Sequence, residues 1–232
     1  MKQLLLSITL LCFLVNSNAQ QDPQLTMHKF NQLYVNPAVS GAYEKYEVGL
    51  YGRTQWTGFD GSPITLGLNS SFDLESINSG VGIQYYYDAL GFEENNKFAL
   101  SYAYHLTLGT GHLNFGLSAG MINKKLDAVW ITPDGTPASV DPSIPDPNAN
   151  GTAFDLGFGT LYHTDKLQVG FSISHILANE IPNVNIKLAR HYWLFVNYDF
   201  EIDESWMISP NILIKSDVTS TQLDFNLYVT YN

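Results

Sequence analysis

The chain has 232 residues, and its 22 acidic residues outnumber its 11 lysines and arginines, which gives a formal net charge of −11 at pH 7. Because the basic residues form no cluster, the sequence lacks the electrostatic basis for binding nucleic acid, and we expect no nucleic-acid partner. The length fits one domain, and the single cysteine lies in an N-terminal stretch that we expect to be cleaved, so the mature chain can form neither a disulfide nor a thiolate metal site.

Residues 1–19 have the pattern of a secretory signal peptide. Lys2 gives a positive start, LLLSITLLCFLV is apolar, and Ser17 and Ala19 have the spacing of a small-residue cleavage site. The apolar run is too short for a transmembrane helix, which needs about 20 residues. Cys12 follows the bulky Leu11, whereas a lipoprotein signal needs a small residue there, so we predict no lipid anchor. Cleavage after Ala19 would leave a mature chain without cysteine.

Residues 20–45 form a lead-in segment that lacks sustained alternation and contains Pro23, Pro37 and Gly41. We expect one short helix or turn here, packed against the mouth of a sheet. The apolar residues at helical spacing are Met27, Phe30, Leu33 and Tyr34.

From residue 46 onward, apolar and polar residues alternate with a period of two. The first hairpin, residues 46–72, has two arms of about ten residues, which exceeds the usual strand of a soluble sheet and suits a tilted strand that crosses a bilayer. The pattern repeats, and it predicts antiparallel strands near 46–56, 62–72, 79–88, 97–107, 112–122, 153–163, 167–176, 190–200, 206–216 and 221–231.

Each predicted strand has one apolar row without charge and one row that tolerates charge. The apolar rows include Leu66, Phe98, Phe158 and Leu194, and the opposite rows include Asp155, Asp199 and Asp224. A secreted β-sandwich or a lipocalin would alternate in the same way with its apolar row turned inward. Alternation alone therefore leaves the direction of the rows open.

Two features favour apolar rows that face lipid. The connections 109–111, 163–166 and 201–205 are short, whereas 88–96, 123–152 and 177–189 are longer, as in outer-membrane barrels. Aromatic residues gather near strand ends, as in the girdles at lipid–water boundaries: Tyr46, Trp56, Tyr85, Tyr87, Tyr162, Tyr192, Trp206 and Tyr231. We therefore predict an all-β fold, an antiparallel transmembrane β-barrel of the outer membrane, over residues 46–232.

Several stretches resemble the PorP/SprF family, which comprises outer-membrane proteins of the type IX secretion system of Bacteroidetes. They are QDPQ, FNQLYVNPAVSG, RTQWTGFDGSPIT, AFDLGFGTLYH with the Pro-rich loop before it, RHYWLFVNYDF, and SPNILIK followed by QLDFNLYVTYN. Members of the family generally continue with further strands beyond the position of Asn232. The resemblance therefore implies that these ten strands are part of a larger barrel.

The resemblance implies a non-enzymatic role in the secretion or surface attachment of cargo with C-terminal secretion signals, such as gliding adhesins. The implied partners are other type IX secretion proteins, the cargo and outer-membrane lipid. The most specific positions, implied to be structural or partner-contacting, are Asn36, Pro37, Gly41, Arg53, Gln55, Trp56, Gly61 and Pro63. We hypothesise that Asn36–Gly41 packs against the Arg53 and Trp56 end of the first strand.

Two other function classes remain. A passive porin fits inner rows rich in Gly, Ser and Asn, and conductance would distinguish it from a plugged barrel.

A barrel enzyme needs a serine beside a histidine, but alternation puts Ser172 and Ser174 on the opposite face from His175, so we expect no catalytic residues and no cofactor.

Metal-binding patterns are weak. The six histidines include no pair two or four residues apart, so the sequence predicts no zinc site. Residues 146–151, DPNANG, match the first half of a calcium-binding loop, but Gly157 occupies the position that requires a bidentate Glu. The alternative is an ordinary surface loop rich in Pro, Asn and Gly.

Overall fold

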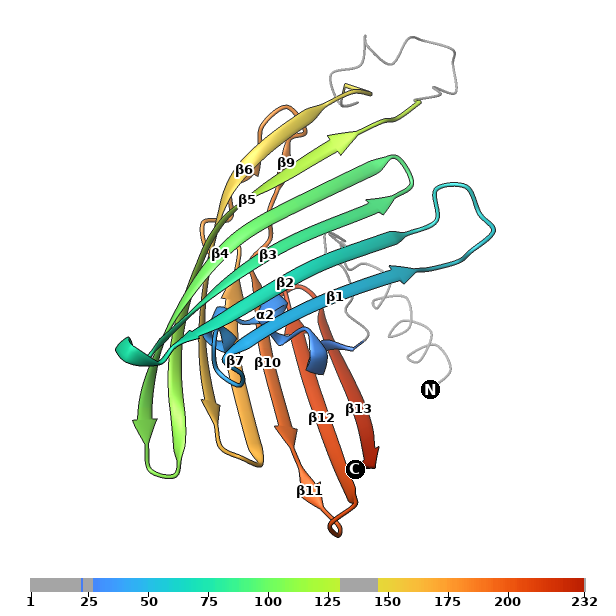
Figure 1. The fold of residues 1–232 in the computed structure, drawn as a ribbon. Helices are drawn as coiled ribbons and strands as arrows, with labels where there is room; N and C mark the ends of the chain where they lie inside the picture. Colours follow the sequence, from blue (N-terminus) through green and yellow to red (C-terminus); the bar gives the residue numbers. More distant parts are fainter. Residues whose placement is uncertain (1–21, 23–26, 130–145, 232) are drawn as a thin grey trace, which may run out of the picture.

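The computed structural model describes residue 22, residues 27–129 and residues 146–231. The expected signal peptide, residues 1–19, lies outside the described residues. One large antiparallel sheet dominates the fold and curves into an incomplete barrel with a concave inner face (Figure 1). The described segments contain no helix with the length and apolarity needed to cross a membrane.

The ten predicted strands are all present in the described residues, with shifted ends. They are β1 (Tyr46–Thr54), β2 (Ile64–Leu74), β3 (Ser79–Leu90), β4 (Glu93–Leu108), β5 (Gly111–Leu126), β6 (Asn150–His163), β7 (Leu167–Ser174), β10 (His191–Tyr198), β12 (Trp206–Ser216) and β13 (Thr221–Tyr231). Each pairs with the next in this order, and β1 and β13 form the two edges, so the sheet is not closed in this chain.

Three short strands complete the description. β8 (Glu180–Ile181) and β9 (Ile186–Lys187) pair with each other in a separate hairpin between β7 and β10. β11 (Phe200–Glu201) adds two further pairs to β12.

The apolar rows face outward. Leu50 and Leu117 are 79% and 62% exposed on the convex face, whereas Asp155 on the concave face is only 6% exposed. The neighbouring rows of Phe98 and Leu194 are likewise exposed, and the charged rows line the inside. The interpretation with an apolar centre, as in a β-sandwich or a lipocalin, is therefore wrong.

The longest connections all lie at one end of the sheet, although that end also has the short turns 91–92 and 217–220. The short connections 109–110 and 164–166 share one end with 199–205, and the longer connections 55–63 and 175–190 share the other. One predicted long loop, 88–96, is wrong, because β3 and β4 stay paired as far as Leu90 and Glu93. The turn contains only Gly91 and Phe92, and Gly91 takes a positive φ of 60°.

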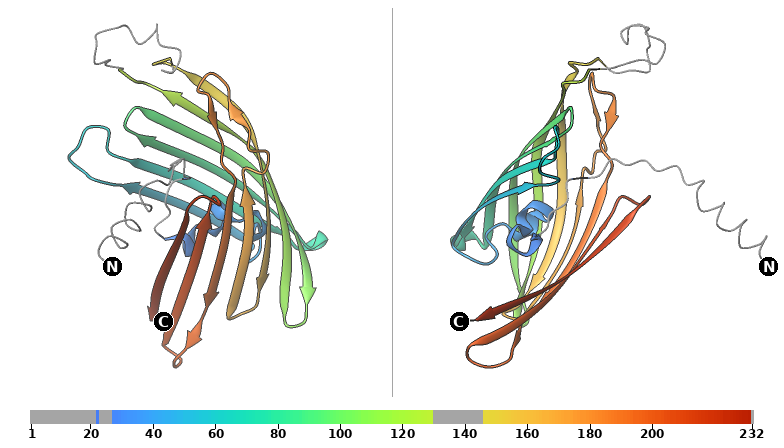
Figure 2. Two further views of the ribbon diagram at one scale, coloured as in Figure 1. Left: turned by 180° about the vertical axis from the view of Figure 1, so that it is seen from behind. Right: turned by 90° about the vertical axis from the view of Figure 1, so that its right-hand side faces the viewer.

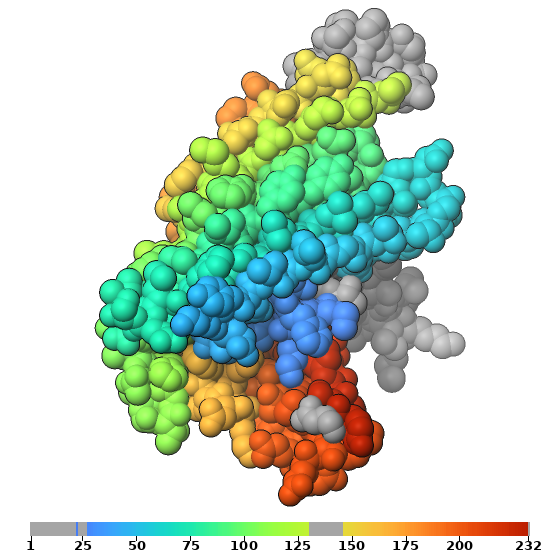
Figure 3. All heavy atoms as spheres, viewed as in Figure 1, coloured from blue at the N-terminus to red at the C-terminus, as the bar shows by residue number. Residues whose placement is uncertain are grey.

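The lead-in does not sit at the mouth of the sheet, as the sequence led us to expect. Its short helices, η1 (His28–Phe30), α2 (Gln32–Val35) and η2 (Pro37–Val39), lie within the concavity (Figures 1 and 2). In a space-filling view, these blue atoms lie between the β1 edge and the C-terminal strands (Figure 3).

An apolar patch on the inner wall explains this position. Leu33, Val35, Ala38 and Val39 of the lead-in pack in one buried cluster with Leu161, Trp193, Phe195 and Leu213 of the wall. The sequence interpretation treated the inner rows as polar and missed this patch. Of the four apolar residues at helical spacing, Met27 and Phe30 are more than half exposed, and this part of the lead-in forms two short helices instead of one.

Candidate functional site

The lead-in forms a plug, which we define as residues 27–43, and Asn36 is its central polar anchor. Asn36 is completely buried, and its Nδ2 donates to the carbonyl oxygen of Thr160 in β6 at 2.9 Å. Its Oδ1 accepts from the backbone N of Ala38 at 2.9 Å and so caps η2. One side chain therefore caps the start of η2 and attaches this helix to the wall, which satisfies polar groups that would be costly to bury alone.

Further polar contacts attach the plug to strands on both sides of the concavity. The Ser40 hydroxyl lies 2.7 Å from Ser101 Oγ in β4, and Gln32 Nε2 donates to Gln168 Oε1 in β7 at 2.9 Å. Lys29 forms an ion pair with Asp199 at 3.2 Å, and its neighbour Phe30 stacks edge-on against Tyr228 of β13. The plug thus bridges early and late strands of the sheet.

Glycines in the wall allow the plug to approach the strands closely. A Cβ atom added to Gly116 of β5 would lie 2.2 Å from the backbone N of Ala38. At Gly80 of β3, an added Cβ would lie 2.0 Å from the carbonyl oxygen of Ser40. Neither position accommodates a larger residue unless the plug moves.

The eight family-signature residues do not form one site. Asn36, Pro37 and Gly41 belong to the plug, where Gly41 takes a φ of 64° and lies against Phe72 and Gly80. The other five lie in the β1–β2 hairpin at the long-loop end: Arg53, Gln55, Trp56, Gly61 and Pro63.

The hypothesis that Asn36–Gly41 packs on the Arg53 and Trp56 end of β1 is therefore wrong. Strand register puts Tyr46 opposite Phe72 and Arg53 opposite Thr65, so Gly41 lies near the other end of β1. The apolar patch on β6, β10 and β12 draws the plug away from the hairpin tip.

The β1–β2 hairpin has its own internal structure. Gln55 N donates to the carbonyl oxygen of Pro63 at 3.0 Å, and Gly91 N of the next hairpin donates to the carbonyl oxygen of Gly61 at 2.8 Å. With the Gln55 amide oriented so that its oxygen faces Arg53, that oxygen accepts from Arg53 Nε at 3.1 Å. Trp56 projects away, 74% exposed, with a φ of 50°. The indole is available to lipid or to a partner.

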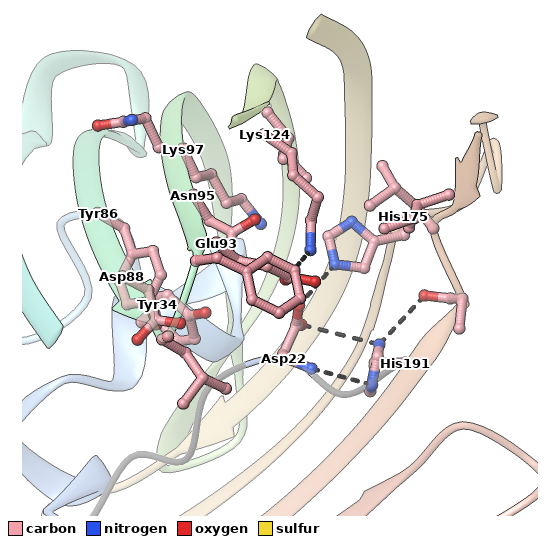
Figure 4. A pocket seen from close by; sticks show the side chains of 18 residues that line it. Asp22, Tyr34, Tyr86, Asp88, Glu93, Asn95, Lys97, Lys124, His175 and His191 are labelled. Atoms are coloured by element: carbon pink, nitrogen blue, oxygen red, sulfur yellow. Dashed lines mark hydrogen bonds and ion pairs between the residues drawn. The ribbon is translucent and has the colours of Figure 1, made fainter. Parts of the chain in front are cut away.

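A second polar cluster was not predicted from the sequence. Asp22, His175 and His191 line a cavity of about 440 Å³ beside the plug, together with Lys97 (Figure 4). His175 lies between two carboxylates, with its Nδ1 2.9 Å from Asp155 Oδ1 and its Nε2 3.0 Å from Asp22 Oδ1. No sequence spacing could reveal this cluster, because Asp22 and the two histidines come from segments far apart in the chain.

The two carboxylates determine the charge of His175. Burial alone would lower the pKa of this imidazole, but the charge of Asp22 and the hydrogen bonds with Asp155 and Asp22 outweigh it and raise the pKa to about 9. The same contact with His175 outweighs burial at Asp22 and holds the pKa of that carboxyl well below its usual range. At neutral pH, an imidazolium ion therefore joins the lead-in to the barrel wall.

Residues 146–151 do not adopt a calcium-binding loop. Asp146 Oδ1 accepts from the backbone N of Asn148 at 2.8 Å, as in an Asx turn. Strand β6 begins at Asn150 and pairs with β5, so the second half of the expected loop is extended. The preceding prolines of the loop lie outside the described residues.

Comparison with protein families agrees with this architecture. A family model described as "Type IX secretion system membrane protein PorP/SprF" matches residues 17–232, which is most of the chain. No curated protein sequence matches the chain. The match and the large antiparallel sheet confirm the predicted β-barrel fold class, although the sheet is open here. The chain therefore belongs to the PorP/SprF family of type IX secretion system membrane proteins.

Proposed function

We propose that the protein works in the cell outer membrane as a non-enzymatic component of the type IX secretion system. In this role it supports secretion or surface attachment of cargo with C-terminal secretion signals, such as gliding adhesins. Family membership supports the link to the secretion system. The observation that carries the membrane role is the uncharged, exposed outer face of the curved sheet.

Aromatic pairs at the short-turn end support a lipid boundary there. Trp206 and Tyr231 lie with ring centroids 4.8 Å apart, and Tyr46 packs edge-on against Phe72. Tyr and Trp favour the headgroup level of a membrane, because one part of each ring system is apolar and another part is polar. The apolar belt therefore ends in an aromatic girdle.

The plug supports a role as a binding platform over a role as a passive pore. It occupies the concavity, and polar contacts hold it to β4, β6 and β7. The wall approaches it closely at Gly80 and Gly116, which lie against its backbone. The long-loop end, with exposed Trp56 and Phe59, offers a surface for a secretion partner.

Deleting the gene and comparing secreted and surface proteomes tests this proposal. We expect a selective loss of proteins with type IX C-terminal signals, restored by the wild-type gene. An unchanged set of type IX cargo in the deletion strain would contradict the proposal.

Conductance tests the porin alternative separately. We expect no steady conductance when the purified protein is inserted into planar bilayers, because the plug stays attached to the wall. Open channels of uniform size, together with unchanged secretion in the deletion strain, would favour a porin.

A further inference from the structure

The fold brings two histidines and one carboxylate together in the inner wall. His175 follows β7, and His191 begins β10, where the register pairs it with Ser174 next to His175. Asp22 reaches both from the lead-in. The three side chains each offer one ligand atom, and these atoms lie within 4.8 Å of one another. Figure 4 shows them at the edge of the cavity.

Each imidazole ring has a hydrogen-bond partner at Nδ1. The Nδ1 atom of His175 contacts Asp155 Oδ1 at 2.9 Å, and the Nδ1 atom of His191 lies 3.1 Å from the carbonyl oxygen of Ala189. The Nε2 atom of His175 lies 3.0 Å from the Asp22 carboxylate, whereas Nε2 of His191 accepts from the backbone N of Asp22 at 3.5 Å, so a rotation of His191 is needed to bring its Nε2 to the carboxylate. Second partners of this kind accompany most metal-binding histidines.

Acidic and basic side chains surround the cluster in equal number. Besides Asp22, the charged groups that face the rings are Asp155 from β6, Lys97 from β4, and Lys215 and Asp217 from the end of β12. Two of these neighbours are acidic and two are basic. The net charge of these four neighbours is therefore zero, and Asp22 supplies the negative charge of the site.

We propose that Asp22, His175 and His191 bind one divalent transition-metal ion, for which Zn²⁺ is the best match. Two imidazoles and one carboxylate are ligands that Zn²⁺ prefers, and a water molecule from the cavity can supply the fourth. Ligand atoms around Zn²⁺ lie roughly 3–3.5 Å apart, so a modest rotation of His191 or Asp22 completes the site. Both histidines are 2% exposed, so the site is protected from bulk solvent.

A metal ion here would attach the lead-in to the wall. Asp22 is the ligand from the lead-in, and the two histidines belong to the β7–β10 region. The ion would strengthen a connection that His175 Nε2 and Asp22 Oδ1 already make at 3.0 Å. This inference does not depend on the secretion role, because it concerns the barrel and its own lead-in.

Calorimetry with the full chain in detergent tests the site. After treatment with EDTA, we expect one Zn²⁺ per chain at pH 7.5, with affinity at least about 100-fold weaker in His175→Ala and in His191→Ala. Asp22→Asn should also weaken binding and is the variant least able to disturb the fold. His112→Ala is the matched control, because His112 is not part of the cluster. Its ring stacks on that of His163, with 5.3 Å between the two ring centroids.

The hydrogen-bond partner of His175 gives a second readout. Asp155→Asn, which replaces the carboxylate beside His175 Nδ1 with a neutral amide, should lower affinity by about 10- to 100-fold. No binding at millimolar Zn²⁺, or binding lost in His112→Ala but retained in His191→Ala, would overturn the proposal.

Discussion

Gly116 is a position where any side chain would collide with the plug. A Cβ added there would lie 2.2 Å from Ala38 N, so Gly116→Val should displace the plug and destabilise the barrel by about 1–3 kcal/mol. The midpoint of the heat-dependent gel shift measures this change. Gly52→Val on the exposed face of β1 is the control, since its Cβ would be 3.4 Å from Leu66. Equal shifts in both variants would contradict close packing at Gly116.

Trp56 illustrates the opposite case. Its indole is 74% exposed and lies away from the plug, so Trp56→Ala should leave the gel-shift midpoint within about 0.5 kcal/mol of wild type. The same variant should reduce cargo secretion if the β1–β2 loop contacts a partner. A large loss of barrel stability would show that Trp56 packs inside the protein.

The imidazolium of His175 makes stability depend on pH. Its pKa rises to about 9 in the fold, above the value of about 6.5 in an unfolded chain, so its contribution is complete below pH 6.5 and disappears as the pH rises through 9. The size is on the order of 3 kcal/mol. Thermal midpoints of the wild type and His175→Gln, measured without metal ions from pH 6 to 10, should differ most at low pH and converge at high pH. A difference between the two thermal midpoints that stays constant from pH 6 to 10 would contradict this ion pair.

At the scale of elements, the strands could be predicted because the two faces of the sheet have different surroundings. Apolar and polar residues therefore alternate along each strand with a period of two. The position of the plug could not be predicted, since it depends on inner apolar residues such as Trp193 and Phe195 that interrupt an otherwise polar row. The cluster of Asp22, His175 and His191 was equally hidden, because strand register brings the two histidines together and the lead-in adds Asp22. The structure places three of the signature residues in the plug and the other five in the β1–β2 hairpin.

The outward row of β5 offers a test of its lipid exposure. Leu117 is 62% exposed near the middle of this strand, so Leu117→Lys should cost about 2–4 kcal/mol in a bilayer, where a charge at the midplane is poorly solvated. Leu117→Met is the control. Urea titrations in lipid vesicles and in detergent should show a larger loss for lysine in vesicles. Equal stability of both variants in vesicles would mean that water surrounds this face.

At the scale of the whole molecule, β1 and β13 are edges of an otherwise paired sheet. Within hydrocarbon, unpaired backbone groups cost several kcal/mol each, so these edges must meet each other or further strands in the membrane. The plug already contacts β13 through Phe30 and Tyr228, and it bonds to β4 through Ser40 and Ser101. It therefore links the two halves of the curved wall.

A cysteine scan along β13 in lipid vesicles tests most directly whether lipid surrounds the outer face. Single cysteines in a background without Cys12 would carry spin labels at Leu223, Phe225, Leu227 and Val229, which point outward, and at Gln222, Asp224 and Asn226, which point inward. We predict that oxygen dissolved in lipid relaxes the outward labels more strongly, with a period of two residues. Stronger relaxation of the outward labels by a water-soluble nickel complex would contradict the account.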